Sequence, residues 1–273
     1  MTWFLVYVLI GGIAAGLLGA LTGLGGGVLI VPLLTVAFKV DIHYAIGAAL
    51  VSVIATSSGA ASAYVREGFS NVRVAMFLEI ATTIGALVGA GLVLYLRVSV
   101  ISIIFGIVLL YSAYASLSER SHAQDARKPG RIASWLGMDG SYPTSSGMER
   151  YYVQGVPLGF ALMFVAGVLS GLLGIGSGAV KVLAMDKAMK LPFKVSTTTS
   201  NFMIGVTAAS GAGVYLHRGY IDPALAMPVM LGVLAGSLLG ARILPRAKVK
   251  VLRWVFACVI AALAIEMIHN GLK

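Results

Sequence analysis

The stretch GLGGGVLIVP (23–32) places three consecutive glycines between two segments that are hydrophobic enough for a bilayer. The segment before it, WFLVYVLIGGIAAGLLGAL (3–21), has about the length of a membrane-spanning helix. A phosphate-binding loop is excluded, because Val28 and Leu29 follow the glycines where such a loop needs Gly-Lys-Ser/Thr. Irregular backbone at membrane depth survives only where protein buries it or where it lines a watered cavity. The glycines therefore predict a break inside the membrane at such a place.

The composition is that of a polytopic helical membrane protein. Hydrophobic residues make up 59% of the 273 residues and charged residues only 11%, against about 25% in an ordinary soluble domain. The net charge of +10 agrees with basic residues retained on the cytoplasmic side of membrane spans. No basic cluster interleaved with aromatic residues indicates a nucleic-acid surface, and the lone Cys258 excludes disulfides and cysteine metal sites. We expect an all-α chain in the inner (plasma) membrane, surrounded by lipid, with no cofactor, metal or nucleic-acid partner.

Hydropathy divides the chain into ten apolar segments and one polar stretch. The segments are 3–22, 26–38, 42–64, 73–96, 98–117, 153–173, 177–189, 193–216, 224–244 and 251–269. The polar stretch 118–152 is rich in charged residues, Ser, Gly and Pro, which is typical of an extramembrane linker. Within it, RIASWLGM (131–138) is a candidate for a short helix on the membrane surface. We therefore expect a first transmembrane repeat (1–117), a linker (118–152) and a second transmembrane repeat (153–273).

The two halves repeat each other at an offset of 151 residues. GLLGALTGLGGGVLIV (16–31) aligns with GVLSGLLGIGSGAVKV (167–182), and 19 of 78 ungapped positions over 16–93 are identical. If each glycine-containing hairpin returns to its own side of the membrane, each half has five segments and the halves are inverted. One side then holds 15 basic residues and the other only four, whereas a reading with parallel halves gives 9 against 10. The positive-inside rule favours the inverted halves, with both termini outside and 118–152 in the cytoplasm.

The segments after the glycine runs, 26–38 and 177–189, are too short to cross a bilayer. Each has 13 residues, about 20 Å of helix against a hydrocarbon core of about 30 Å. We expect half-helices whose N-termini open near the midplane, where free N–H groups and a partial positive charge suit an anion. The candidate binding residues are Gly25, Gly26, Gly27, Gly176, Ser177 and Gly178. Close helix packing is the alternative, and it is the favoured role for the isolated Gly85 and Gly89.

These residues resemble a known family. The duplicated G-L-G-G-G-x-x-x-x-P turn, the following helix with Tyr64 and Gly68, and the second-half echo GIGSG…STTTSNFMIG…YLHRGYID are similar to the sulfite exporter TauE/SafE family. The resemblance covers nearly the whole chain except 118–152. It implies a secondary transporter of small sulfur-containing anions such as sulfite, sulfonates or related oxyanions.

The second half departs from the family pattern at the half-helix. Ser177 interrupts the glycines, Leu183 replaces the proline, and Lys181 and Asp186 appear. An ionisable residue inside the membrane is a functional hypothesis by default, and Lys181 is a candidate for the fixed charge that attracts the anion. A snorkelling lysine or a pair with Asp186 is the alternative.

Hydroxyl and carboxyl groups supply the remaining candidates. In the run 196–201 we expect binding roles for Thr197, Thr198, Ser200 and Asn201, with bonds to their own helix carbonyls as the alternative. Thr56 and Thr207, which the repeat aligns, are further candidates. Glu79 could carry a coupling proton or pair with Arg73.

No HExxH pattern, carboxylate pair or Ser/His/Asp arrangement indicates an enzyme. The sequence therefore predicts a secondary transporter, most simply an exporter, of a small sulfur-containing anion by alternating access. An anion channel of the same fold, and a transporter of a non-sulfur carboxylate or oxyanion, stay open as alternatives, as does a homodimer.

Overall fold

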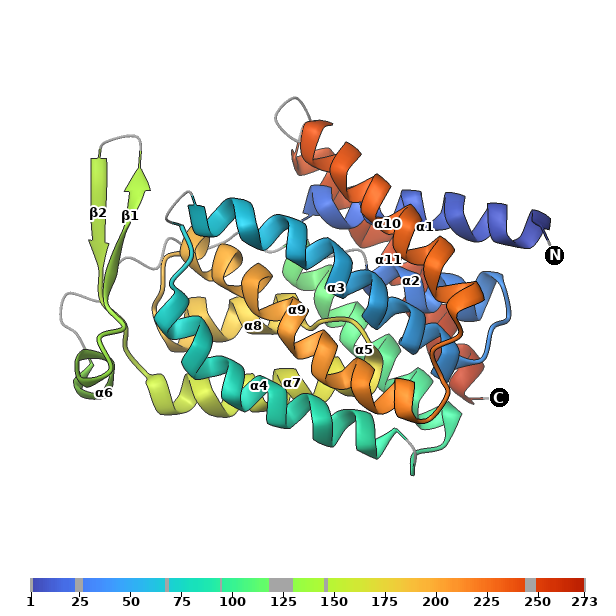
Figure 1. Ribbon diagram of the computed structural model, residues 1–273, viewed down its shortest axis with the longest axis horizontal. Coiled ribbons are helices and arrows are strands. Elements are labelled where there is room, and N and C mark those ends of the chain that lie inside the picture. The colour runs from blue at the N-terminus through green and yellow to red at the C-terminus, as the bar shows by residue number, and fades with distance from the viewer. Residues whose placement is uncertain are drawn as a thin grey trace.

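The computed structural model describes residues 2–22, 27–66, 69–93, 95–117, 130–144, 147–243 and 249–272. They form an elongated bundle of helices (Figure 1). The first half contains α1 (Thr2–Thr22), α2 (Gly27–Pro32), the π-helix η1 (Leu33–Ala37), α3 (Ile42–Arg66), α4 (Val72–Leu92) and α5 (Val98–Leu117). The second contains α7 (Val156–Leu173), α8 (Gly178–Leu183), the π-helix η2 (Ala184–Ala188), α9 (Phe193–His217), α10 (Pro223–Ile243) and α11 (Val249–Leu272). Each predicted apolar segment corresponds to one of these helices, α2–η1 and α8–η2 being the two short ones.

The linker contains a β-hairpin, which the all-α prediction did not include, while the rest of the described secondary structure is helical. After the short helix α6 (Arg131–Trp135), the strands β1 (Gly140–Thr144) and β2 (Gly147–Tyr151) pair antiparallel. Tyr142 and Tyr151 are buried with their rings 6.1 Å apart, and this aromatic pair stabilises the hairpin. Neither strand, GSYPT or GMERY, alternates apolar and polar residues, which is why the sequence did not reveal them. The surface role predicted for 131–138 stays a prediction, although α6 is helical as expected.

Asn71 fastens the linker to the start of α4. Its side-chain oxygen accepts from Val74 N and caps α4, while its Nδ2 donates to Met138 O at 2.7 Å and to the Tyr151 hydroxyl at 2.8 Å. Arg73 adds a bond from Nη1 to Gly137 O at 3.0 Å. Burial raises the pKa of the Tyr151 phenol, so this hydroxyl stays protonated at neutral pH. The described part of the linker is thereby attached to the start of α4.

Glycines allow α4 to pack closely against α7, and α1 against α10. A Cβ added at Gly85 would collide with Phe164 O, and one added at Gly236 would collide with Ile13 O. Gly236 lies 151 positions after Gly85, and Ile13 lies 151 positions before Phe164. The same contact therefore occurs twice, with the two halves exchanged. Gly89 likewise meets Val168 O. The packing role expected for Gly85 and Gly89 is confirmed.

The repeat also extends to the backbone of the turns after the π-helices. Lys39 and Lys190, 151 positions apart, both have left-handed φ, at 54° and 60°. In each half the N–H of the next residue donates to the carbonyl six residues before it. Val40 N donates to Leu34 O and Leu191 N to Met185 O, both at 3.0 Å. Asp222 caps α10 through Ala224 N, as Asn71 caps α4. Local structure therefore follows the repeat even where the residues differ.

Corresponding helices run in opposite directions along the long axis of the molecule. In Figure 1, α3 runs towards the end that carries the β-hairpin, while its counterpart α9, which packs against it, starts there and runs away. The N- and C-termini lie at the end opposite the hairpin. The linker and the termini thus mark the two ends of the bundle.

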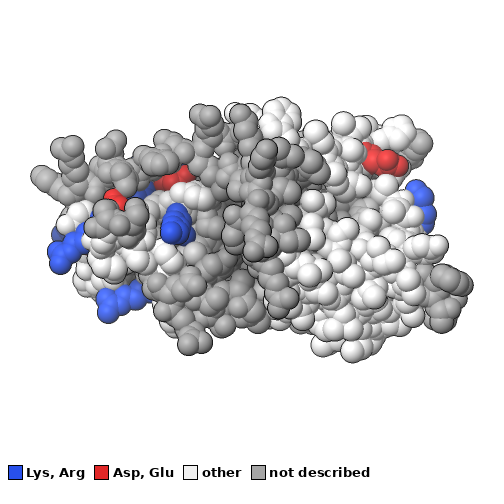
Figure 2. Space-filling view, turned by 90° about the horizontal axis from the view of Figure 1, so that it is seen from above, with Lys and Arg blue, Asp and Glu red and all other residues white. Residues whose placement is uncertain are grey.

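The sides of the bundle are apolar. Within the described residues, Val72–Leu92 and Val156–Leu173 are long and apolar enough to cross a membrane. The other apolar stretches are shorter among the described residues, for example Ile42–Ser57 and Val98–Tyr114. A stripe of exposed side chains runs along α4: Met76, Ile80, Ile84, Leu87 and Val88. Figure 2 shows the visible Lys, Arg, Asp and Glu side chains towards the two ends of one face. Such a surface suits contact with lipid.

Candidate functional site

The second glycine run forms a tight left-handed turn between α7 and α8. Gly174 and Gly176 have φ of 69° and 67°, and Ser177, which precedes the first residue of α8, has φ of 46°. Glycine adopts this conformation freely, whereas a serine there is strained. The Ser177 side chain is only 3% exposed, and its Oγ has no hydrogen-bond partner among the described residues. A buried hydroxyl without a partner at the start of a helix is a candidate ligand group.

The start of the first half-helix lies beside this turn. A Cβ added at Gly27 would come within 3.4 Å of Gly174 O. Val53 lies between them, because its methyl groups face both Gly27 and Gly176. Ile204, the residue 151 positions after Val53, also faces Gly176. The two half-helices therefore begin next to each other. The candidates Gly25 and Gly26 lie outside the described residues.

Lys181 is 0% exposed in the second turn after Ser177. Its Nζ donates to Thr207 Oγ1 at 2.5 Å, and Thr207 Oγ1 in turn donates to Glu79 Oε1 at 2.6 Å. The snorkelling alternative is wrong, because the ammonium is enclosed in protein. Asp186 is also buried, on η2, and its pairing with Lys181 stays a prediction.

Glu79 enters the same centre from the first half. Its Oε2 is enclosed and has no hydrogen-bond partner among the described residues, while Thr83 Oγ1 lies 3.4 Å from Oε1. Arg73 donates to Gly137 O rather than reaching towards Glu79. The centre thus joins α4 with α8 and α9. Sequence reasoning missed Thr83, although its spacing of four residues from Glu79 on a helix places both on one face.

The hydroxyl run of α9 is engaged with the protein itself. Thr197 bonds to Phe193 O at 2.9 Å, Thr198 to Phe69 O at 2.9 Å, and Ser200 to Gly178 O at 3.3 Å. The predicted Thr56 likewise bonds to Ser52 O in its own helix at 3.0 Å. The Thr198 bond ties α9 to the segment before α4, and the Ser200 bond ties it to the start of α8.

Thr199 of the same run, which was not predicted, accepts a hydrogen bond from Asn71 N at 3.0 Å. Asn201 is half-buried. The binding roles proposed for the run stay predictions.

The seam between α4 and α9 continues from the centre towards the termini. Thr207, Ser210, Val214 and His217 recur at helical spacing along α9. A cavity of about 340 Å³ lies at the end of the seam. It is lined by Leu87, Ser210, Gly213, Val214, His217 and Arg218. The Ser210 hydroxyl and the Arg218 guanidinium suit the approach of an anion.

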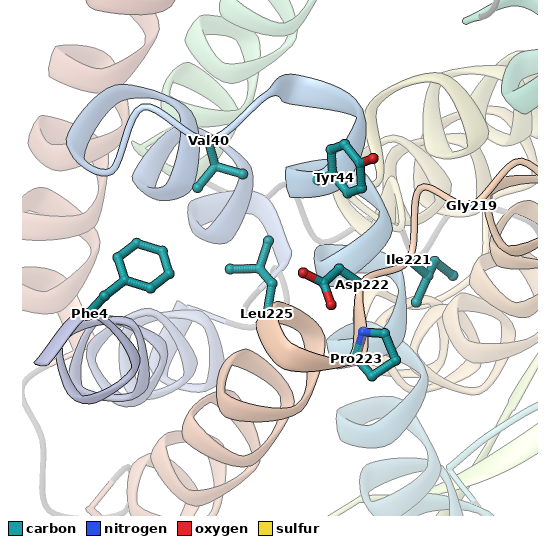
Figure 3. A pocket seen from close by; sticks show the side chains of 8 residues that line it. All are labelled: Phe4, Val40, Tyr44, Gly219, Ile221, Asp222, Pro223 and Leu225. Atoms are coloured by element: carbon teal, nitrogen blue, oxygen red, sulfur yellow. The ribbon is translucent and has the colours of Figure 1, made fainter. Parts of the chain in front are cut away.

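A second cavity, of about 610 Å³, opens between α1, the start of α3 and the turn before α10 (Figure 3). Its lining residues are Phe4, Val40, Tyr44, Gly219, Ile221, Asp222, Pro223 and Leu225. Asp222 and the Tyr44 phenol are the two ionisable groups among these lining residues. Because a carboxylate repels an anion, this cavity is a weaker candidate for an anion site than the surroundings of Lys181.

Comparison with known proteins gives matches along nearly the whole chain. A family model described as sulfite exporter TauE/SafE matches residues 8–267. The probable membrane transporter protein YunE of Bacillus subtilis is 28% identical over 276 residues, covering 98% of this chain and 98% of that protein. The probable membrane transporter protein MJ0441 of Methanocaldococcus jannaschii is 25% identical over 276 residues, covering 96% and 94%. No solved structure gives a significant match.

Proposed function

The chain belongs to the sulfite exporter TauE/SafE family and is a membrane transporter, and we propose that it is a secondary transporter, most simply an exporter, of a small sulfur-containing anion. The observation that carries this proposal is the fully buried Lys181 beside the glycine turn of α8. Within the protein its counter-charge is Glu79, reached through Thr207, and an ammonium in this place also offers a bound anion a charge-assisted hydrogen bond. The family points to sulfite or an organosulfonate as that anion.

The anion would bind between Ser177 and Lys181. The two residues are four apart, so they lie on one face of the half-helix. A sulfonate or sulfite accepts several hydrogen bonds, which the Ser177 hydroxyl, the Lys181 ammonium and the N–H groups around Gly178 can donate. Gly27 would bring the first half-helix to the opposite side of the anion. Thr207 and Asn201 would complete the site from α9.

Alternating access would follow from inverted halves in a multi-pass membrane protein. Two observations support inversion: helix contacts that recur at an offset of 151 residues with the halves exchanged, and corresponding helices that run in opposite directions (Figure 1). Halves related in this way can rock around a fixed site so that it opens to either face.

Cysteine labelling would test the orientation of the halves. Ser141→Cys lies on the exposed hairpin and Asn270→Cys in the exposed last turn of α11. We expect a membrane-impermeant maleimide to label Asn270→Cys in intact cells and Ser141→Cys only after permeabilisation, because the linker should be cytoplasmic. Both variants are made in a Cys258→Ala background, since Cys258 is exposed. Labelling of both sites in intact cells would contradict the arrangement.

Counterflow in proteoliposomes would test transport itself. Vesicles loaded with unlabelled sulfite or ethanesulfonate should accumulate the labelled anion faster than unloaded vesicles, because a carrier returns faster when occupied. Equal rates would indicate an anion channel. Stimulation by acetate or oxalate but by no sulfur anion would exclude the sulfur assignment. Protein-free liposomes with the same load supply the background.

A further inference from the structure

Glu79 and Lys181 are opposite charges bridged by one hydroxyl in the middle of the bundle. Lys181 Nζ donates to Thr207 Oγ1 at 2.5 Å, and Thr207 Oγ1 lies 2.6 Å from Glu79 Oε1. The positions 151 residues away from Glu79 and Lys181 are Met230 and Ile30. The two charges therefore break the repeat, and the centre that they form is not duplicated.

Thr207 can report the protonation state of Glu79. Its hydroxyl has a single hydrogen and two acceptors within reach, Glu79 Oε1 at 2.6 Å and Met203 O at 3.0 Å. An ionised Glu79 takes that hydrogen bond. A protonated Glu79 can itself donate to Thr207 Oγ1, and the threonine hydrogen then turns to Met203 O. Both arrangements satisfy the hydroxyl, so the centre accommodates either state without moving a helix.

The two protonation states of Glu79 differ in the net charge that they leave at the centre. With Glu79 ionised, the buried ammonium of Lys181 has its counter-charge within the protein. With Glu79 protonated, Lys181 has no counter-charge at Thr207, and a buried unpaired cation is strongly unfavourable. An anion beside Lys181 restores the balance. The proton on Glu79 is held at Oε1, which lies 2.6 Å from Thr207 Oγ1, while the enclosed Oε2 has no hydrogen-bond partner among the described residues to stabilise the ionised form.

We propose that Glu79 carries a coupling proton, so that one anion and one proton occupy the centre together and are transported in the same direction. The proton comes from water, bonds to a Glu79 oxygen and frees Lys181 for the anion. When both leave, Glu79 is ionised again and pairs with Lys181 through Thr207. The empty centre is then neutral and can return across the membrane. This inference rests on the proposed anion transport at the same site.

Few other titratable groups face Glu79. Among the described residues, α7 and α9 pack most extensively against α4, and α7 has no ionisable side chain. The second half-helix brings Lys181 to Glu79 through Thr207 and also carries the buried Asp186. On α9, Lys194 lies 4.2 Å from the Phe69 ring and the Tyr215 hydroxyl donates to Gly171 O. His217 is ten residues beyond Thr207, or about 15 Å along the helix, and it lines the outer cavity. His217 is therefore the group that a pH experiment has to control for.

Ethanesulfonate is the probe for the test, because it stays a monoanion throughout the pH range of the titration. Binding to the detergent-purified full chain is measured by calorimetry as a function of pH and in buffers with different ionisation enthalpies. Above the pH at which Glu79 ionises, we expect affinity to fall by about tenfold per pH unit, with uptake of about one proton per anion. Glu79→Gln should bind without proton uptake and with no such slope. His217→Gln and Glu266→Gln, both altering exposed side chains, should keep the slope.

Each result separates the two proposals. Binding that is independent of pH, or that proceeds without proton uptake in the unaltered protein, would overturn proton coupling and leave anion transport intact. A slope that persists in Glu79→Gln and vanishes in His217→Gln would assign the proton to the histidine instead. Absence of ethanesulfonate and sulfite binding at every pH would overturn the proposed function itself. If Glu79→Gln fails to fold, the proton count on the unaltered protein still tests proton coupling, and the count on His217→Gln shows whether the histidine carries the proton.

Discussion

Lys181→Ala should weaken binding of the anion by roughly 10- to 150-fold, because a charge-assisted hydrogen bond contributes about 1.5–3 kcal/mol. The variant should still fold, since the half-helix keeps its backbone and Glu79 can protonate once its cation is gone. Lys181→Arg should recover part of the affinity, because the charge persists although its geometry changes. The measurement is titration of ethanesulfonate into the purified protein at a pH where the unaltered chain binds well.

Lys187→Ala is the matched control for Lys181→Ala. Lys187 lies six residues further along the same half-helix but is exposed, so its removal should leave affinity unchanged. Unaltered affinity in a well-folded Lys181→Ala protein would remove Lys181 from the site. If Lys181 instead pairs with Asp186, both single alanine variants should lose stability and the double variant should regain much of it.

Gly89→Val should destabilise the bundle by about 3 kcal/mol or more, because overpacking of this kind forces the backbone to shift. Any Cβ at Gly89 collides with the carbonyl of Val168 on α7, which is backbone and cannot turn aside. The thermal midpoint in detergent and the yield of monodisperse protein measure the effect. We expect Gly89→Val to be recovered poorly or to melt far below the unaltered chain.

Gly91→Val isolates the cause of that loss. Gly91 lies on the same helix, and a Cβ added there meets nothing within 4 Å. The two substitutions change helix propensity equally, so their difference measures the contact with α7. Equal melting temperatures would show that α4 and α7 do not pack through Gly89.

The boundaries of the helices could be predicted because membrane helices are long apolar segments that a hydropathy profile detects. The segment predicted at 98–117 is α5 (Val98–Leu117), and the half-helix predicted at 177–189 appears as α8 and η2 over 178–188. The switch to π-helix in both half-helices could not be predicted, since the hydropathy of a segment does not distinguish the two kinds of helix. The hairpin was missed because its strands lie in a polar stretch.

Individual candidate residues could be predicted, but their partners could not. Lys181, Glu79 and Thr207 each stood out as a polar residue in an apolar segment. Thr207 and Glu79 are 128 positions apart, and their meeting depends on the packing of α4 against α9, on which the spacing of residues along one chain says nothing. The repeat could not help, because two of the three residues lack an equivalent in the other half.

Each half depends on the other for the surfaces that its glycines expose. The glycine face of α4 packs against α7, and that of α1 against α10. Residues 1–117 alone would therefore leave both of these faces without a partner helix. During synthesis these two helix contacts therefore form only after the second half has been inserted into the bilayer. If the halves are inverted as proposed, a single-unit ancestor could have completed the same contacts only by pairing with a copy inserted upside down. Gene fusion would have fixed that pairing and allowed Glu79 and Lys181 to arise in one copy each.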